Sequence, residues 1–183
     1  MTALWVTLLI PFAGMLLLAV IGERRGAGRL NVVFNTGMLA ASLALAWQVL
    51  EDGPLLSQNK MFYIDAFNVF LVALTAFVGL TTAIFSRPYM QHEVEARNIG
   101  RRRMRLYHSM YQGFMFTMMA ALTTNNIGIL WVAMEGATLA TVLLVSLYRT
   151  PEAIEAAWKY FILCGVGITQ ALFGTVLMYF AAE

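Results

Sequence analysis

Charged residues are scarce in this sequence, since Asp, Glu, Lys and Arg together make up 12% of its 183 residues. Soluble domains carry about 25% charged and about 45–50% apolar residues, whereas 60% of this chain is hydrophobic. One core of this size cannot hide so much apolar surface from water. The scarcity of charge therefore excludes an ordinary soluble domain and favours a chain that lies in the lipid bilayer.

Cysteine and histidine are also rare, with one cysteine, Cys164, and two histidines, His92 and His108. A single cysteine excludes a disulfide within the chain, and the two histidines offer no metal-ligating spacing. The sequence has no glycine-rich phosphate loop and no Ser-His-Asp set. We therefore predict no catalytic centre of its own, no cofactor and no metal site. Both histidines fall in or beside a polar segment, where we expect them to be solvated.

Long apolar runs divide the chain into about six segments, and a helix needs about 20 mainly apolar residues to span the hydrocarbon core. The sequence therefore predicts an all-α, polytopic membrane protein, a single transmembrane domain over residues 1–183 with helices at about 3–21, 30–50, 65–86, 108–123, 127–147 and 152–180. Asp65 and Thr150 are suited to cap helix N-termini, and Asn125-Asn126 to form a turn. Arg87-Pro88 is expected to end the third helix, and residues 87–107 to form a polar loop or a surface-lying helix.

Arginines are distributed unevenly between the connections. The segments after the first, third and fifth helices hold all the arginines, whereas those after the second and fourth hold only Lys60. Cytoplasmic loops carry an excess of Lys and Arg, so we expect residues 22–29, 87–107 and 148–151 to be cytoplasmic and both termini to lie outside. The same rule explains the triplet Arg101-Arg102-Arg103 better than an RNA-binding patch does, and we predict no nucleic-acid partner.

Glu135 is the informative position, because the predicted fifth helix is otherwise free of charge from Ile127 to Leu147. A charge at a helix centre costs about 2.5–3.5 kcal/mol on insertion scales, and ionisable residues at this depth usually carry ions or protons. The small neighbours Gly136 and Ala137 would allow another helix to approach closely. The sequence therefore predicts a proton- or ion-carrying carboxyl. The alternative is a neutral glutamic acid that hydrogen-bonds a neighbouring helix.

Two weaker candidates accompany Glu135. Thr138 lies one helical turn further on the same face and can offer a hydroxyl. Lys159, near the cytoplasmic start of the sixth helix, could pair with Glu135 in a buried polar line. Two other interpretations of Lys159 stay open: it snorkels to the membrane interface beside aromatic neighbours, or it pairs with Glu155 one turn earlier.

Five short stretches resemble one family of membrane proteins. They are Ile64-Asp65-Ala66-Phe67, Tyr89-Met90-Gln91-His92-Glu93, Asn125-Asn126, Met134-Glu135-Gly136-Ala137-Thr138-Leu139 and Glu155-Ala156-Ala157-Trp158-Lys159-Tyr160. The family comprises the antiporter-like membrane subunits of respiratory complex I, the Mrp-type cation/proton antiporters and the energy-converting hydrogenases. The resemblance covers nearly the whole chain and is closest to the F component of hydrogenase-4.

The resemblance implies a function and partners. Family members sit in the membrane arm of a redox complex and move protons along charged residues at mid-membrane depth. Glu135 matches the family's fifth-helix glutamate, and Lys159 matches the sixth-helix lysine of the hydrogenase-like branch. The resemblance thus implies a multi-pass subunit of a prokaryotic-type inner membrane, surrounded by lipid and by other membrane subunits of an oxidoreductase complex.

The chain departs from the family in length. Family members have about fourteen helices, built on two inverted repeats of about five helices each, whereas this sequence holds only the first six. The lysine-bearing seventh helix and the second repeat are not in it. We therefore expect a fragment, or one piece of a split subunit whose partner chain supplies the further helices. A non-conducting structural or assembly subunit is the alternative function.

Overall fold

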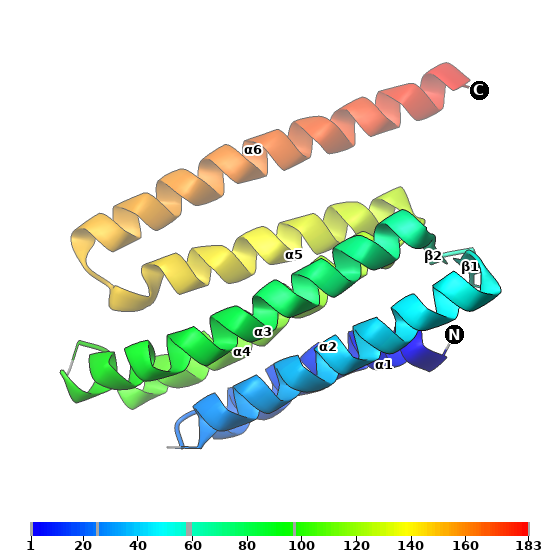
Figure 1. The fold of residues 1–183 in the computed structure, drawn as a ribbon. Helices are drawn as coiled ribbons and strands as arrows, with labels where there is room; N and C mark the ends of the chain where they lie inside the picture. The colour runs from blue at the N-terminus through cyan, green and yellow to red at the C-terminus, as the bar shows by residue number, and fades with distance from the viewer. Residues whose placement is uncertain (1, 25, 58–59, 97, 183) are drawn as a thin grey trace.

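The computed structural model describes residues 2–24, 26–57, 60–96 and 98–182, which form long helices running back and forth (Figure 1). In chain order the elements are α1 (Thr2–Ile21), α2 (Ala27–Asp52), β1 (Leu55–Leu56), β2 (Tyr63–Ile64), α3 (Ala66–Glu95), α4 (Arg101–Thr123), α5 (Ile127–Val145), the 3-10 turn η1 (Ser146–Tyr148) and α6 (Pro151–Ala182). The predicted all-α class is confirmed. The short hairpin β1–β2 is an addition that the polar composition of its surroundings concealed.

Five of the described helices are long and apolar enough to cross a bilayer, namely α1, α2, α3, α5 with η1, and α6. The chain is therefore a multi-pass membrane protein. α4 is not in this group, because its first two turns carry four arginines and its interior holds polar side chains. α4 packs against α1, α3 and α5, and its polar residues His108, Ser109 and Gln112 are at most 4% exposed. A helix enclosed in this way needs less apolar surface than one that faces lipid.

The helices alternate in direction, so their connections gather at two ends of the molecule (Figure 1). The α1–α2, α3–α4 and α5–α6 connections lie at one end, and the hairpin, the α4–α5 turn and both chain ends lie at the other. We call the first the arginine-rich end, after Arg24, Arg101, Arg102, Arg103 and Arg149. The predicted alternation of basic and non-basic connections is therefore also a separation in space.

Side-chain caps begin three of the helices. Asp65 before α3, Asn126 before α5 and Thr150 before α6 each accept a hydrogen bond from the backbone N–H three residues on, at 2.7, 3.1 and 3.2 Å. Such caps satisfy N–H groups that have no partner within the helix. The predicted caps Asp65 and Thr150 are confirmed, and Asn126 serves the predicted turn between α4 and α5.

The third helix is longer than the sequence predicts. α3 continues through Pro88 to its end at Glu95, and α4 begins at Arg101, so most of segment 87–107 is helical. Proline is tolerated in membrane helices where neighbouring groups satisfy the freed backbone. Met90 and Ile99, two apolar side chains of this polar segment, are buried together with Leu147 of η1, and this small cluster holds the end of α3 and the approach to α4 in place. The expectation that Arg87-Pro88 ends the helix is wrong for this reason.

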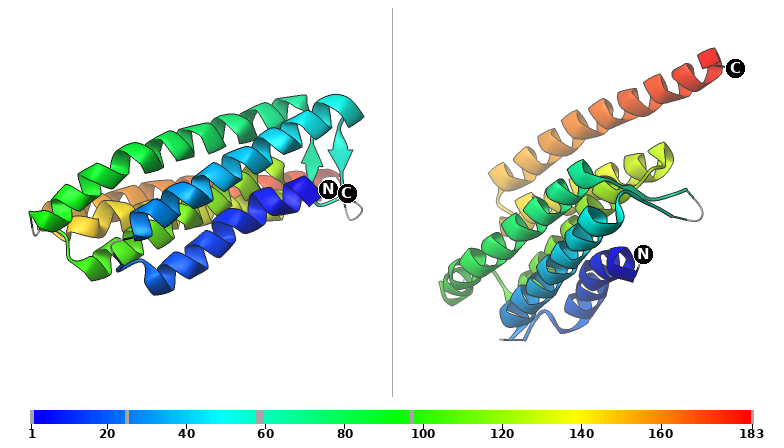
Figure 2. Two further views of the ribbon diagram at one scale, coloured as in Figure 1. Left: turned by 60° about the horizontal axis from the view of Figure 1, so that its bottom comes forward. Right: turned by 45° about the vertical axis from the view of Figure 1, so that its right-hand side comes forward.

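Two parts of the molecule differ in how tightly they are packed. Helices α1–α4, which we call the inner bundle, enclose the main core, with Leu4, Met38, Leu45, Val72 and Met119 at 1% exposure or less. α6 packs mainly against α5 and stands apart from the inner bundle (Figure 2). In the most apolar stretch of α6 no described residue is buried, whereas 33% of the residues are buried in the corresponding stretches of α1 and of α2.

His108 is enclosed by the inner bundle, so the expectation of a solvated histidine is wrong there.

Candidate functional site between α5 and α6

Glu135 lies in the middle of α5. It is eight residues beyond the first residue of this 19-residue helix, which places it about 12 Å along the axis at about 1.5 Å per residue. Its side chain is half-buried, and it makes no hydrogen bond or ion pair with another described residue. The structure thus presents a mid-helix carboxyl that is neither fully enclosed nor bonded to a neighbour in the described ranges.

One face of α5 is built for close packing on α4. Ala133, Ala137 and Ala140 are buried there. A Cβ atom added to Gly136 would lie 2.9 Å from Cγ2 of Thr117 on α4, closer than real Cβ contacts come. The small residues around Glu135 therefore bring α5 against α4, and they form a different face from the one that carries the carboxyl.

The opposite face of α5 is joined to α6 by two hydrogen bonds. Trp131 Nε1 donates to the carbonyl oxygen of Ile168 at 3.1 Å, and Thr141 Oγ1 donates to the hydroxyl of Tyr160 at 3.1 Å. Glu135 lies one turn after Trp131, and residues four apart share a helix face. Glu135 therefore belongs to this contact region, which we call the α5–α6 seam and define by Trp131, Glu135, Thr141, Tyr160 and Ile168.

The seam has open space near Glu135. The two hydrogen bonds run between antiparallel helices and place Glu135 at about the level of Gly165 on α6. A Cβ atom added to Gly165 would meet no atom within 4 Å. One turn further along α5, an apolar groove of about 440 Å³ opens between the two helices from Leu139 to Ser146. The carboxyl thus stands beside a loosely packed contact in which water or another side chain has room.

Thr138 lies one turn beyond Glu135 and is 7% exposed. Its hydroxyl donates to the carbonyl oxygen of Met134 on its own helix at 3.1 Å. The proton of this hydroxyl is therefore engaged, although its oxygen can still accept a hydrogen bond. A direct role of Thr138 beside Glu135 stays a prediction.

Lys159 is placed away from Glu135. Its Nζ donates to Oε1 of Glu155 at 2.5 Å, and the two side chains are 69% and 63% exposed. The next residue, Tyr160, makes the hydrogen bond to α5. Of the three interpretations of Lys159 made from the sequence, its contact here is the pair with Glu155. A part in proton transfer stays a prediction.

Sequence reasoning missed a buried polar group in the inner bundle. Gln112 Nε2 on α4 donates to Oδ1 of Asn31 on α2 at 2.7 Å, and Asn35 Nδ2 donates to the carbonyl oxygen of Asn31 at 2.8 Å. All three side chains are at most 2% exposed. Their spacing was visible, because Asn31 and Asn35 are four residues apart and Gln112 follows His108 by four. Both pairs fall near expected helix ends, where polar residues usually face water.

Fold and site together define a class, that of multi-pass helical membrane proteins with an ionisable group in the middle of an apolar helix. Comparison with known proteins is more specific. Residues 124–183 match the family described as "NADH:quinone oxidoreductase/Mrp antiporter, TM", and this range contains Glu135 and Lys159. The family match thus covers the α5–α6 seam.

Three relatives extend the similarity to the rest of the chain. The "Hydrogenase-4 component F homolog" of Methylacidiphilum infernorum is 47% identical over 176 residues, which are 96% of this chain and 36% of the relative. "NADH-quinone oxidoreductase subunit L" of Neisseria meningitidis is 24% identical over 98% of this chain and 30% of the relative. Subunit N from Campylobacter lari is 22% identical over 81% of this chain and 30% of the relative.

The chain spans about a third of the length of these curated relatives. The predicted resemblance is confirmed: the chain is similar to the N-terminal part of an antiporter-like membrane subunit of the hydrogenase-4 and NADH-quinone oxidoreductase family.

Proposed function

We propose that Glu135 takes up and releases protons as part of an antiporter-like membrane subunit in a multi-subunit redox complex. The observation that carries the proposal is the position of this carboxyl at mid-helix depth in the α5–α6 seam, half-buried and without a bonded partner in the described residues. A carboxyl at this depth is costly. If this position served only for packing, an apolar side chain would fill it equally well without that cost.

The relatives support the redox setting of this proposal. Their names are those of a hydrogenase-4 component and of NADH-quinone oxidoreductase subunits. We propose by similarity that this chain also assembles with other membrane subunits of an oxidoreductase complex, in a lipid bilayer, and that one of them supplies further helices. The exposed length of α6 is the surface that such a subunit would cover, because most of its large apolar side chains are exposed.

The test compares two variants of Glu135 in membranes that carry the whole complex. Glu135→Gln keeps size and hydrogen-bonding ability but cannot ionise, whereas Glu135→Asp keeps ionisation and shortens the reach by one methylene. We expect the glutamine variant to assemble normally and to lose proton translocation per redox turnover, and the aspartate variant to retain part of it. Glu152→Gln is the matched control, because it removes an exposed carboxyl from the first turn of α6.

The alternative is a structural or assembly subunit in which Glu135 is a hydrogen-bonding strut. Under this alternative the glutamine variant should be tolerated better than the aspartate variant, because glutamine can still donate and accept hydrogen bonds whereas aspartate cannot reach the same partner. Full translocation by Glu135→Gln at matched subunit abundance would remove Glu135 from the mechanism. The structural alternative would then be the better description of the chain.

We also propose that the arginine-rich end faces the cytoplasm of a prokaryotic-type cell and that both chain ends lie outside. The gathering of the basic connections at one end supports this orientation, because cytoplasmic loops carry excess Lys and Arg. In a Cys164→Ala background, Ala96→Cys between α3 and α4 should react with a membrane-impermeant thiol reagent only from the cytoplasmic side. Labelling from outside intact cells would reverse the orientation.

A further inference from the structure

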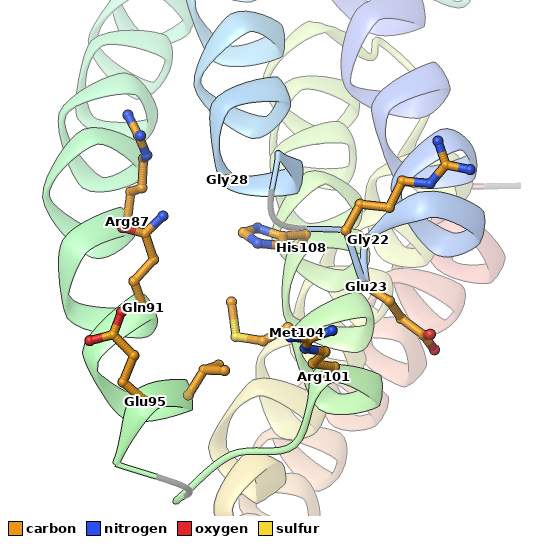
Figure 3. A pocket seen from close by; sticks show the side chains of 11 residues that line it. Gly22, Glu23, Gly28, Arg87, Gln91, Glu95, Arg101, Met104 and His108 are labelled. Atoms are coloured by element: carbon orange, nitrogen blue, oxygen red, sulfur yellow. The ribbon is translucent and has the colours of Figure 1, made fainter.

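A cavity of about 510 Å³ opens at the arginine-rich end of the inner bundle. Its walls come from the α1–α2 connection, from α3 and from α4, and Figure 3 shows Arg87 and Gln91 on the α3 wall and His108 reaching in from α4. Charged residues also line the cavity, namely Glu23, Arg24, Glu95 and Arg101. It belongs to a different part of the molecule from the α5–α6 seam.

Polar groups continue inward from this cavity. His108 lines it and is 4% exposed, and Nδ1 of its ring is buried without a hydrogen-bond partner in the described residues. One turn further on α4, Gln112 is hydrogen-bonded to Asn31 of α2. One turn further on α2, Asn35 is fully buried. We call His108, Asn31, Gln112 and Asn35 the polar file.

The inner end of the polar file has an unsatisfied acceptor. Oδ1 of Asn35 is buried and has no hydrogen-bond partner among the described residues. The amide orientation is fixed, because Nδ2 donates to the carbonyl oxygen of Asn31, which can only accept. Rotating the amide by 180° would set two oxygens against each other. A buried acceptor left without a donor is costly, so a donor from outside the chain is the physical expectation.

Oδ1 of Asn35 and Oε1 of Gln112 lie close to glycines of the neighbouring helices α3 and α1. The carboxamide oxygen of Asn35 lies 3.3 Å from the Cβ position of Gly79 on α3, where the end of the Met115 side chain also lies. The Tyr111 hydroxyl donates to the carbonyl oxygen of Gly79. On the other side of the bundle, Oε1 of Gln112 lies 3.1 Å from the Cβ position of Gly14 on α1. Buried waters typically bond two to four polar groups of this kind.

Apolar side chains close the polar file on its far side. Met38, three residues beyond Asn35, is 0% exposed, and Met115, three residues beyond Gln112, is 2% exposed. From Gly28 at the cavity to Asn35 is seven residues of α2, or about 10 Å along the helix. The polar file is therefore a short inlet with one open end and one apolar end.

We propose that this cavity and the polar file form a water-filled vestibule, which brings water and the protons that it carries about 10 Å into the inner bundle and ends at Met38 and Met115. The ligand is water, held by the amides of Asn31, Asn35 and Gln112 and by His108. The vestibule is independent of Glu135, because that carboxyl faces α6 and the vestibule lies among α1, α2, α3 and α4.

Cysteine reactivity tests the vestibule in the full chain, embedded in membranes, with Cys164→Ala as the background. Asn35→Cys is paired with Met38→Cys on α2, and Gln112→Cys with Met115→Cys on α4. The reagent is a small cationic methanethiosulfonate, and the measurement is the rate of modification by intact mass. We expect residues 35 and 112 to react about tenfold or more faster than 38 and 115, because a thiolate forms in water and is suppressed in apolar surroundings.

Each outcome decides the proposal. Equal rates of modification within both pairs would show a dry interior and would overturn the vestibule. If one variant fails to accumulate, the pair on the other helix decides. The route is tested by adding Gly28→Phe, because the Cβ position of Gly28 already lies 3.3 Å from Cγ of Arg87 and a larger side chain fills the cavity. Unchanged fast labelling in that variant would show that water enters elsewhere and would overturn the vestibule. No redox turnover is needed, so the result is separate from that for Glu135.

Discussion

In the inner bundle, polar side chains are buried and bonded to one another, whereas in α6 even large apolar side chains are exposed. Gln112 and Asn31 meet at 2.7 Å with at most 2% exposure, while Leu163 and Phe173 on α6 are 75% and 63% exposed. Both regions are helical and hydrophobic in composition. The difference shows that α1–α4 make their own interior, and that α6 presents a surface to lipid or to another chain.

Glu135 lies near the boundary between these two regions. Its helix, α5, is packed tightly on α4 through Gly136 and loosely on α6 near Gly165. A carboxyl on the loosely packed side can meet water or a partner without disturbing the core. The comparison thus gives a physical reason for the proposal that protons exchange in the α5–α6 seam, while the inner bundle provides structural stability.

The largest expected difference in stability between the two regions follows from replacing a glycine by alanine. A Cβ atom at Gly22 would lie 2.8 Å from the Arg105 Cα and would also meet the Leu18 carbonyl oxygen, and backbone atoms cannot move aside easily. We expect Gly22→Ala to lower the free energy of unfolding by about 2–3 kcal/mol, measured by denaturant titration in mixed micelles. In α6, Gly167 has no atom within 4 Å of its Cβ position, so Gly167→Ala should stabilise by about 0.5–1 kcal/mol. Equal effects at both positions would contradict the contrast.

A smaller difference in stability is expected when a glutamine of each region is replaced by leucine. Gln112→Leu removes the donor to Oδ1 of Asn31 and leaves that acceptor buried, which should cost about 1–2 kcal/mol of unfolding free energy. Gln170→Leu makes the same change on an exposed part of α6, and its effect should stay within about 0.5 kcal/mol. The same titration compares them. If Gln170→Leu is the more damaging variant, α6 has an interior that the described chain does not reveal.

The smallest effect is expected at Lys159. Its ion pair with Glu155 joins two mostly exposed side chains, and helix pairs of this kind contribute about 0.5 kcal/mol or less. Lys159→Gln and Glu155→Gln should therefore lower stability slightly and equally, and the double variant should add little, because the pair is lost only once. A large loss of proton translocation in Lys159→Gln alone would show that this lysine takes part in proton transfer, and it would contradict the expectation that the exposed side of α6 has no such part.

Much of the fold was predictable because it depends on local pattern. Apolar runs of membrane-spanning length, the caps Asp65 and Thr150, and the alternation of arginine-bearing connections are all properties of single segments. The extension of α3 beyond Pro88 was not predictable in this way. It depends on Met90 packing with Ile99, in the same charged segment, and with Leu147, which is more than fifty residues away in the sequence.

For the candidate site, too, local pattern predicted one part and helix packing decided the other. The sequence by itself determined that Glu135 is a carboxyl at the centre of an apolar helix, because depth follows from counting residues along α5. Only the tertiary structure decided that Glu135 faces α6, that Lys159 pairs with Glu155, and that His108 is enclosed with Gln112. The physical reason is that the face a side chain presents, and whether it is buried, depends on which helices pack against each other. That arrangement is fixed by contacts between α1, α2, α4, α5 and α6 and cannot be read from any one of them.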